Sequence, residues 1–440
     1  MNAPASTPGE RLPQRGLRFA ALLLQTILAT PLLLLLILTA LPAPEFGFGS
    51  PPIPAWEAAL VLGLGPVLLF VGLLLASWRL QARSWLRIGL GYVALAAVLA
   101  YLAHDDPTVR HPLTLEELSP PFPGAEASYA VLMRYGKAQP LGRNFKAPNC
   151  PVAGELARPT ALAQWRDALH AHRAELEANW AALAPVRAWW NELSAFDRIG
   201  DLTPARADAD IPAFQPLRSV SQHAVAIARL QALDGRGDDA IETLLPILQV
   251  GRKLQGNSRT LVRTMMAIVI ERMSLQTANF ILDNSTVTPA ARARLAAALQ
   301  GGDPEGGARH LLSTEYAFYS SAFGSKRVGD IWAEIGTGAV HPWRRRALNA
   351  VSPFLYNPRA TVNLYGDVHA DLQGLLARRQ FTAMDARVQD FVESHTRRPS
   401  FKNVFGQLFA SAVPAYSKIF QSYWETQDQR AALLARVTKA

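Results

Sequence analysis

The sequence is poor in cysteine and in charge. It has one cysteine, Cys150, and 18% of its 440 residues are charged, against about 25% in a typical soluble domain. A single cysteine cannot form an internal disulfide, which excludes a disulfide-rich scaffold. Half of the residues are hydrophobic, which excludes a disordered chain. Much of this apolar surplus falls in the first hundred residues, which excludes an ordinary cytosolic enzyme and indicates a membrane protein.

Three long apolar stretches follow one another near the N-terminus. They cover residues 17–41, 56–78 and 85–102. Each is close to or above the roughly 20 apolar residues that cross a hydrocarbon core as a helix. Trp56, Trp78 and Trp85 lie at the ends of these stretches, and amphipathic rings prefer the membrane interface. We therefore predict three transmembrane helices.

A cleaved signal peptide is the alternative interpretation of the first stretch. Arg11, Arg15 and Arg18 would suit its basic N-terminal region. However, the apolar run is longer than the roughly 7–15 residues of a signal-peptide core, and no clear cleavage site follows it. A retained helix is therefore the preferred prediction.

The arginines near the apolar stretches predict their orientation. They gather before the first stretch and between the second and third: Arg11, Arg15, Arg18, Arg79, Arg83 and Arg87. The loop between the first and second stretches has no Lys or Arg. Cytoplasmic loops carry the excess of these residues, so the N-terminus is predicted to be cytoplasmic. Everything after about residue 104 is then outside, which in a bacterium means the periplasmic side of the inner membrane.

The remaining chain is predicted to form a linker and one helical domain. Residues 1–104 form the membrane region, residues 105–160 form a proline-rich collar, and residues 161–440 form an extracytoplasmic domain. Nine prolines in the collar break any long regular element apart from a short helix at 127–135. Almost no segment alternates at period two, so the predicted fold class is all-α.

Apolar spacing near 3.6 residues predicts the helices of the extracytoplasmic domain. They cover residues 161–183, 219–233, 240–254, 259–282, 291–300, 306–323, 362–379 and 400–424. The helix at 259–282 is apolar on most faces and should form the centre of the core. Residues 224–254 are similar to one tetratricopeptide hairpin, but no second copy follows at a period of about 34 residues. The broader prediction is a set of packed helical hairpins.

The last predicted helix, 400–424, carries an aromatic stripe. Its aromatic and aliphatic members are Phe401, Val404, Phe405, Leu408, Phe409, Val413, Tyr416, Ile419, Phe420 and Tyr423. Lys402 and Lys418 lie beside the stripe, and Pro414 should kink the helix. Such a helix can lie flat on an anionic bilayer. It can equally be the last core helix of the domain, and this second interpretation is preferred.

One short motif resembles a metal site. Residues 365–371 (YGDVHAD) resemble the first metal-binding motif of calcineurin-like metallophosphoesterases, in which Asp367 and His369 would be ligands. That family needs further ligands in downstream GDxxD and GNH motifs, and neither follows here. Two ligands cannot hold a two-metal centre. No metal ligand, cofactor-binding residue or catalytic residue is therefore predicted.

A carboxylate in the most apolar helix is the main unexplained charge. Glu271 should pair with Arg263 or Arg272, since a buried charge needs a partner. If the chain is an enzyme, an unfamiliar hydrolytic site using Glu271, His310 or Glu315 is the alternative to consider.

Two basic or aromatic clusters are the candidate contact residues for lipid or a partner. They are Arg344, Arg345 and Arg346, with Phe401, Phe405, Phe409, Lys402 and Lys418. Arginines outside the cytoplasm would face solvent or phospholipid, and no nucleic acid is expected as a partner.

The sequence as a whole favours a non-enzymatic binding or scaffold subunit of a bacterial envelope assembly, held in the inner membrane. Its expected partners are the lipid bilayer and other envelope proteins. The two alternatives are a membrane-anchored hydrolase and a lipid-interacting protein that uses the helix 400–424.

Overall fold

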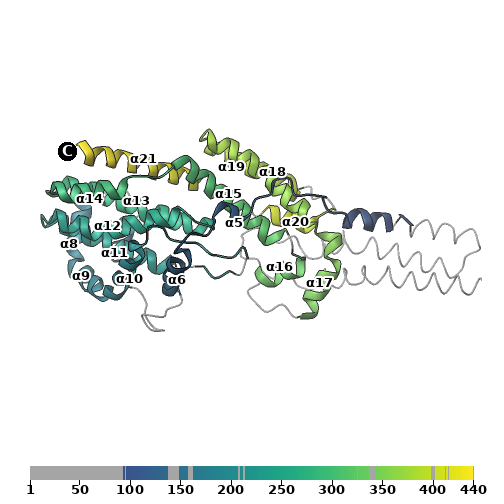
Figure 1. Cartoon of the computed structure of the whole chain (residues 1–440), viewed down its shortest axis with the longest axis horizontal. Helices are drawn as coiled ribbons and strands as arrows, with labels where there is room; N and C mark the ends of the chain where they lie inside the picture. Colours follow the sequence, from purple (N-terminus) through teal and green to yellow (C-terminus); the bar gives the residue numbers. More distant parts are fainter. Residues whose placement is uncertain are drawn as a thin grey trace, which may run out of the picture. The chain divides into compact units, whose positions relative to one another are not determined.

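The computed structural model is entirely α-helical in the part of the chain that it describes (Figure 1). The described residues are 93–94, 96–136, 148–156, 162–206, 209–211, 214–324, 326–335, 342–397, 402–411, 413–414 and 416–439. The first two predicted membrane spans, and the third as far as residue 92, lie outside them. Within these ranges, no helix combines the length and the apolar character needed to cross a bilayer.

Seventeen helices with defined bounds are described, in addition to a helical stretch at 96–103. They are α5 (Leu115–Leu118), α6 (Ala125–Gly136), α7 (Ala153–Leu156), α8 (Leu162–Ala171), α9 (Arg173–Ala182), α10 (Ala184–Ala195), α11 (Phe214–Leu233), α12 (Gly237–Gln255), α13 (Leu261–Asn284), α14 (Pro289–Leu299), α15 (Pro304–Phe323), α16 (Val328–Ile335), α17 (Pro342–Leu355), α18 (Pro358–Ala377), α19 (Phe381–Arg397), α20 (Val404–Ala410) and α21 (Ser417–Lys439). The predicted all-α class is confirmed for these residues.

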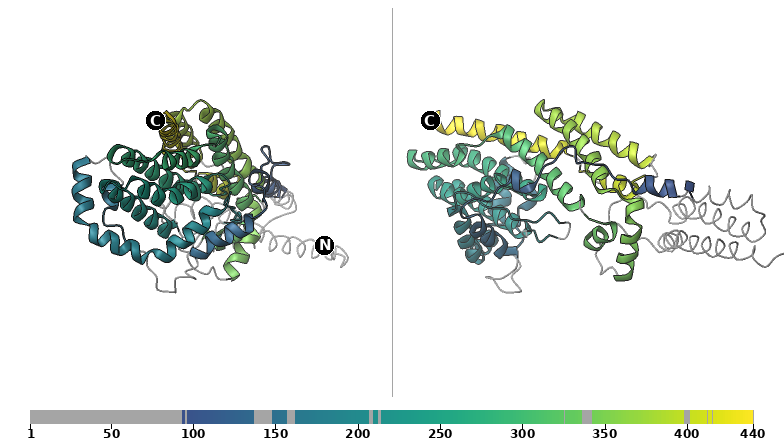
Figure 2. Two further views of the ribbon diagram at one scale, coloured as in Figure 1. Left: turned by 60° about the vertical axis from the view of Figure 1, so that its left-hand side comes forward. Right: turned by 45° about the vertical axis from the view of Figure 1, so that its right-hand side comes forward.

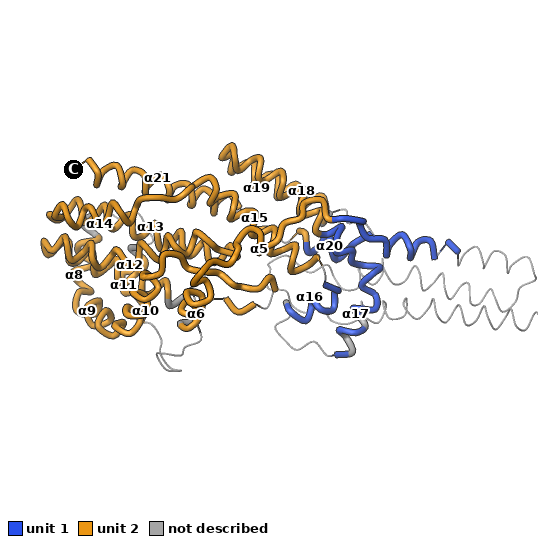
Figure 3. Tube along the Cα trace, in the orientation of Figure 1, with its two compact units in different colours: residues 1–108, 325–361, 398–409 blue, residues 109–324, 362–397, 410–440 orange. Residues whose placement is uncertain are grey.

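The chain divides into two compact units, coloured separately in Figure 3. Unit 1 comprises residues 1–108, 325–361 and 398–409, and unit 2 comprises residues 109–324, 362–397 and 410–440. This grouping differs from the contiguous domains predicted above, because two segments of the predicted 161–440 domain group with the N-terminal part. Helical periodicity locates each helix but does not say which helices pack together.

The centre of unit 2 is formed by α11, α12 and α13, which pack pairwise. Gly235, with φ of 76°, closes the short turn between α11 and α12, a backbone conformation that favours glycine. Thr260 caps α13 by accepting a hydrogen bond from the backbone N–H of Arg263. Most of α13 is buried, so the predicted core helix is confirmed.

The C-terminal helix α21 completes the unit by packing on α13, α14 and α19. Figure 2 shows these helices from two further directions. Phe420 and Leu433 of α21 are buried at 0% and 1% exposure. Segments far apart in the sequence therefore pack into the same two hydrophobic clusters, one with Leu433 and one with Phe420.

The described part of the predicted collar is largely structured. Helix α6 confirms the predicted short helix, and the Nε1 of Trp189 donates a 2.7 Å hydrogen bond to the carbonyl of Val131 within it. Thr114 and Glu117 form a capping box at the start of α5. Residues 109–136 thus pack into unit 2 instead of acting as a free linker.

Two predicted helices are interrupted in the structure. The predicted helix 161–183 is two helices, α8 and α9, which meet at His172. The predicted single aromatic helix 400–424 is wrong. It is replaced by α20 and α21, with a break that contains Pro414. Proline lacks the backbone donor and disfavours helical geometry in the preceding residue, so it ends this helix instead of kinking it.

Candidate membrane-facing surface

Unit 1 gathers segments that are far apart in the sequence. Its described residues include the helical stretch 96–103, α16, α17 and α20. Both predicted contact clusters, Arg344–Arg346 on α17 and Lys402–Phe409 around α20, belong to this unit. Only Lys418 of the predicted contact residues belongs to unit 2, where it is exposed on α21. Phe401 and the side chain of Arg344 lie outside the described residues.

A buried asparagine joins two of these segments. Asn403 adopts a φ of 60° and is 3% exposed. Its Oδ1 accepts a 2.8 Å hydrogen bond from the backbone N–H of Asn357, and its Nδ2 donates to the Thr361 Oγ1 at 3.0 Å. Asparagine tolerates this left-handed conformation better than most residues. The residue type at position 403 therefore suits both the backbone conformation and the hydrogen bonds of its side chain.

The segment after the third predicted span is fixed to the same unit. Asp105 accepts hydrogen bonds from the backbone N–H groups of Arg359 and Ala360, at 3.0 and 2.9 Å, in the first turn of α18. A carboxylate at a helix N-terminus is stabilised by the helix dipole. The Nδ2 of Asn357 also donates to the carbonyl of His104 at 2.8 Å. Asp105 therefore has a structural role that its sequence context does not reveal.

Unit 1 exposes several large apolar side chains. Val93, Val98 and Tyr101 are 67%, 53% and 62% exposed, and Leu408 of α20 is 52% exposed. The Nζ of Lys402 lies 5.1 Å from the ring centroid of Tyr101, a cation–π contact. Lysine and tyrosine are side chains that place an apolar body in lipid and a polar end at the interface. This group is called the exposed apolar group of unit 1 below.

The predicted contact residues differ in how exposed they are to a lipid or a protein partner. Phe409 is 8% exposed and packs edge-on against Tyr356, so it belongs to the interior of unit 1. Phe405 is partly buried and contacts Trp332. Arg346 is exposed, whereas the Nε of Arg345 is paired with Asp330 at 2.8 Å. Leu408 is exposed although helical periodicity places it on the same stripe as buried residues such as Phe409, so the sequence pattern does not distinguish it.

The carboxylate Glu271 is buried in unit 2 with partners that the sequence did not predict. The Nη1 of Arg430 lies 3.5 Å and the Nε of Arg252 4.0 Å from its Oε1, and the Nε2 of Gln255 donates a hydrogen bond to its Oε2. Burial raises the pKa of Glu271, and the two guanidinium groups oppose this effect.

The predicted pairing of Glu271 with Arg263 or Arg272 is wrong. Arg263 pairs with Asp201 and Arg272 with Glu425. The reason is tertiary: α21 and α12 bring arginines to Glu271 from outside its own helix.

The other hydrolase candidates also have structural partners. The Nε2 of His310 lies 3.1 Å from the carbonyl of Ser258, and burial lowers the pKa of this histidine. Burial raises the pKa of Glu315 to about 7, although a hydrogen bond from the backbone N–H of Leu261 lowers it. Both side chains therefore have backbone partners at or just before the start of α13.

The two residues of the metal-like motif are engaged separately. Asp367 pairs with Arg110 at 2.9 Å and with His111 at 3.3 Å. His369 stacks on the ring of Tyr316 with centroids 4.7 Å apart, and burial lowers its pKa to about 4. Among the described residues, no group of three or more His, Cys, Asp or Glu side chains could hold a metal ion.

Comparison of the chain with protein-family models, with curated proteins and with solved structures finds no match.

Proposed function

We propose that the chain is an integral protein of the bacterial inner membrane and a non-enzymatic binding or scaffold subunit of an envelope assembly. Its N-terminus is cytoplasmic and its helical units lie on the periplasmic side. Its partners are the lipid bilayer and other envelope proteins.

The exposed apolar group of unit 1 is the observation that supports this proposal. Val93, Val98 and Tyr101 lie in the C-terminal part of the third predicted span, residues 85–102, and each residue is more than half exposed. Large apolar side chains exposed together are costly in water and favour contact with lipid or a partner. Tyr101, near the end of this span, and Lys402, which contacts its ring, are residue types found at membrane interfaces.

The basic residues of unit 1 agree with an anionic lipid surface. Its described segments carry seven Lys or Arg, namely Lys326, Arg327, Arg344, Arg345, Arg346, Arg359 and Lys402, against Asp105, Asp106, Asp330 and Glu334. Each cation near an anionic bilayer contributes about 1 kcal/mol of attraction. For the alternative of a lipid-interacting protein, Lys402 and the exposed Leu408 remain as candidate lipid contacts. Phe420 and Tyr423 of the predicted aromatic stripe are buried and cannot contact lipid.

A thiol-labelling experiment tests the location. Cys150 is 6% exposed, so its thiol reacts poorly with reagents in solution. The experiment therefore uses a Cys150→Ala background, into which Ala293→Cys introduces a thiol at an exposed position of α14. A membrane-impermeant maleimide added to intact cells with a permeabilised outer membrane should label it. A matched variant with Ser6→Cys, ahead of the first predicted span, should react only after lysis. The reverse pattern would end the periplasmic proposal.

A complementation experiment separates the scaffold from the hydrolase. Glu315→Gln removes an ionisable group while keeping a hydrogen-bond acceptor for Leu261. In a strain lacking the protein, this variant should restore the wild-type phenotype if the protein acts by binding. Loss of function at normal abundance and normal thermal stability would favour the hydrolase.

A further inference from the structure

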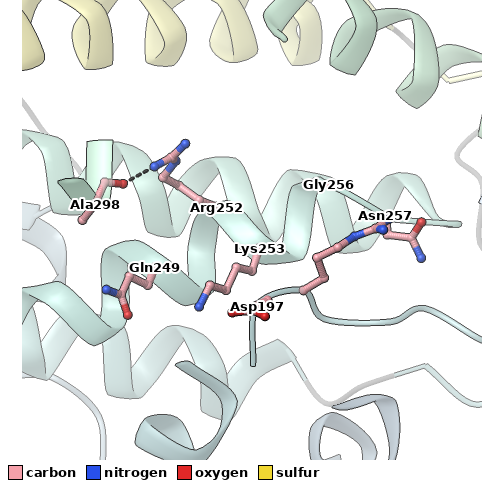
Figure 4. A pocket seen from close by; sticks show the side chains of 8 residues that line it. Asp197, Gln249, Arg252, Lys253, Gly256, Asn257 and Ala298 are labelled. Carbon is pink, nitrogen blue, oxygen red and sulfur yellow. Dashed lines mark hydrogen bonds between the residues drawn. The ribbon is translucent and has the colours of Figure 1, made fainter. Parts of the chain in front are cut away.

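A cleft in unit 2 lies over the last two turns of α12 (Figure 4). Gln249, Arg252, Lys253 and Gly256 follow a spacing of three and four residues and form its floor. Asp197, Arg198 and Asn257 form one wall, and Ala298 at the end of α14 lies at the other. Its volume of about 280 Å³ suits a small ligand.

The cleft carries an excess of positive charge. Its lining contains Arg198, Arg252 and Lys253 against the single carboxylate of Asp197. Figure 4 shows Lys253 directed toward Asp197 and Gln249, and Arg252 directed toward Ala298. The two α12 cations therefore extend to opposite sides of the same floor.

Neutral carbonyl groups hold both α12 cations in place. The Nζ of Lys253 donates to the carbonyl of Ser194 at 2.6 Å, in the last turn of α10. The Nη2 of Arg252 donates to the carbonyls of Gln300 and Gly301 at 2.8 and 3.0 Å, just after α14. The partner of Lys253 is therefore uncharged, whereas the Nε of Arg252 also lies 4.0 Å from the Oε1 of Glu271, whose charge opposes that of Arg252.

Arg198 is the most available of the three cations. It is exposed, and its guanidinium carbon lies 4.2 Å from the centroid of the Phe122 ring. No carboxylate of a described residue forms an ion pair with it within 4 Å. Burial lowers the pKa of Lys253, and the charge of Arg252 lowers it further, whereas Asp197 raises it. A bound anion would relieve this repulsion.

We propose that this cleft binds a phosphate group, held by Arg198 and Lys253 across the floor formed by α12. A phosphate offers several acceptor oxygens, so it can be bound from the floor and from one wall at once. A planar arginine fork and a lysine ammonium are the usual donors to such a group. The group can come from a soluble phosphate compound or from the headgroup of a phospholipid.

Calorimetric titration of inorganic phosphate into the full chain tests the proposal. The chain is held in nanodiscs of zwitterionic lipid, and chloride is exchanged so that ionic strength stays constant. Saturable binding is expected, and Arg198→Gln should weaken it about tenfold because a charge-assisted hydrogen bond is lost. Lys253→Gln should weaken it similarly, and Lys253→Arg should retain most of the binding.

Arg294→Gln is the matched control, since it removes an exposed arginine of α14 that does not line the cleft. Absence of binding by the wild type at millimolar phosphate would overturn the proposal, as would equal weakening by Arg198→Gln and Arg294→Gln. Arg198 is exposed, so its variant should fold even if Lys253→Gln does not.

Nanodiscs with an anionic phospholipid distinguish the two sources of the phosphate group. Weaker binding of inorganic phosphate there indicates that the headgroup competes for the cleft. Unchanged binding indicates a soluble ligand.

Discussion

A fully buried ion pair fixes the loop before α11 to α13. Asp201 and Arg263 are each 1% exposed, and the Arg263 Nη1 lies 3.5 Å from the Asp201 Oδ2. Arg263 also donates to the carbonyls of Ile199 and Gly200, at 2.8 and 2.7 Å. The Asp201 Oδ2 also accepts a 2.7 Å hydrogen bond from the backbone N–H of Arg259, and its Oδ1 accepts from the backbone N–H and the Oγ1 of Thr203 at 3.0 and 2.6 Å.

Asp201→Asn should be strongly destabilising, because it leaves the Arg263 charge buried without its counter-charge. We expect a loss of about 3–5 kcal/mol in the free energy of unfolding. Urea unfolding of the full chain in detergent, followed by tryptophan fluorescence, measures this loss. Arg294→Gln breaks an exposed pair with Glu242 and should cost less than about 1 kcal/mol. Similar losses in the two variants would contradict this account.

Glu315 should make stability depend on pH. Its pKa is raised from 4.5 to about 7 in the folded protein. Between these values the unfolded chain ionises first and binds fewer protons, so the free energy of unfolding falls as pH rises. The expected fall is at most about 3 kcal/mol, and less where water reaches the side chain.

Unfolding midpoints measured from pH 4 to pH 8 check the Glu315 prediction. Glu315→Gln has no proton to lose, so the difference between wild type and variant should vary across this range and level off above about pH 7. A constant difference would show that Glu315 ionises normally in the folded state.

At the scale of elements, α12 and α13 approach each other closely at Gly251. A Cβ atom there would lie 3.0 Å from the Cγ2 of Ile270 and 3.2 Å from the backbone nitrogen of Glu271. This spacing leaves no room for a branched side chain. Helix α12 carries Arg252 and Gln255, and α13 carries Glu271, so the separation of the two helices also sets these two contacts.

Two glycine substitutions should have opposite effects. Gly251→Val should destabilise the protein by about 1–3 kcal/mol, because it forces the helices apart. Gly374→Ala, in α18, meets nothing closer than 3.9 Å and should stabilise by about 0.5–1 kcal/mol, because glycine in a helix costs backbone entropy. Thermal unfolding of both variants, followed by circular dichroism, measures the two shifts. Destabilisation by both substitutions would contradict the difference in local packing.

At the scale of the whole molecule, the proposal requires the chain to be integral to the membrane. The protein should remain in the membrane fraction after washing with alkaline carbonate, which releases peripheral proteins. Release by carbonate would mean that the apolar stretches of the first hundred residues do not anchor it. Arg346→Gln should not change this fractionation, since exposed charges contribute far less than a spanning helix.

The sequence by itself determined the helical class and the positions of most helices. The five helices from α11 to α15 begin or end within a few residues of the predicted bounds, because each has its own apolar periodicity and its own turn residues. Pro414 predicted a kink in the last aromatic helix. Whether a proline kinks a helix or ends it depends on the neighbouring groups that replace the lost backbone hydrogen bonds.

Only the tertiary structure decided which side chains meet. Arg430 reaches Glu271 across 159 positions of sequence, and Lys402 reaches Tyr101 across 301. Periodicity places a residue on a face of its helix and carries no information about the distant helix that covers this face. Packing decides which buried charges pair. It also groups residues 93–108 with α16, α17 and α20, and it is a property of the folded chain as a whole.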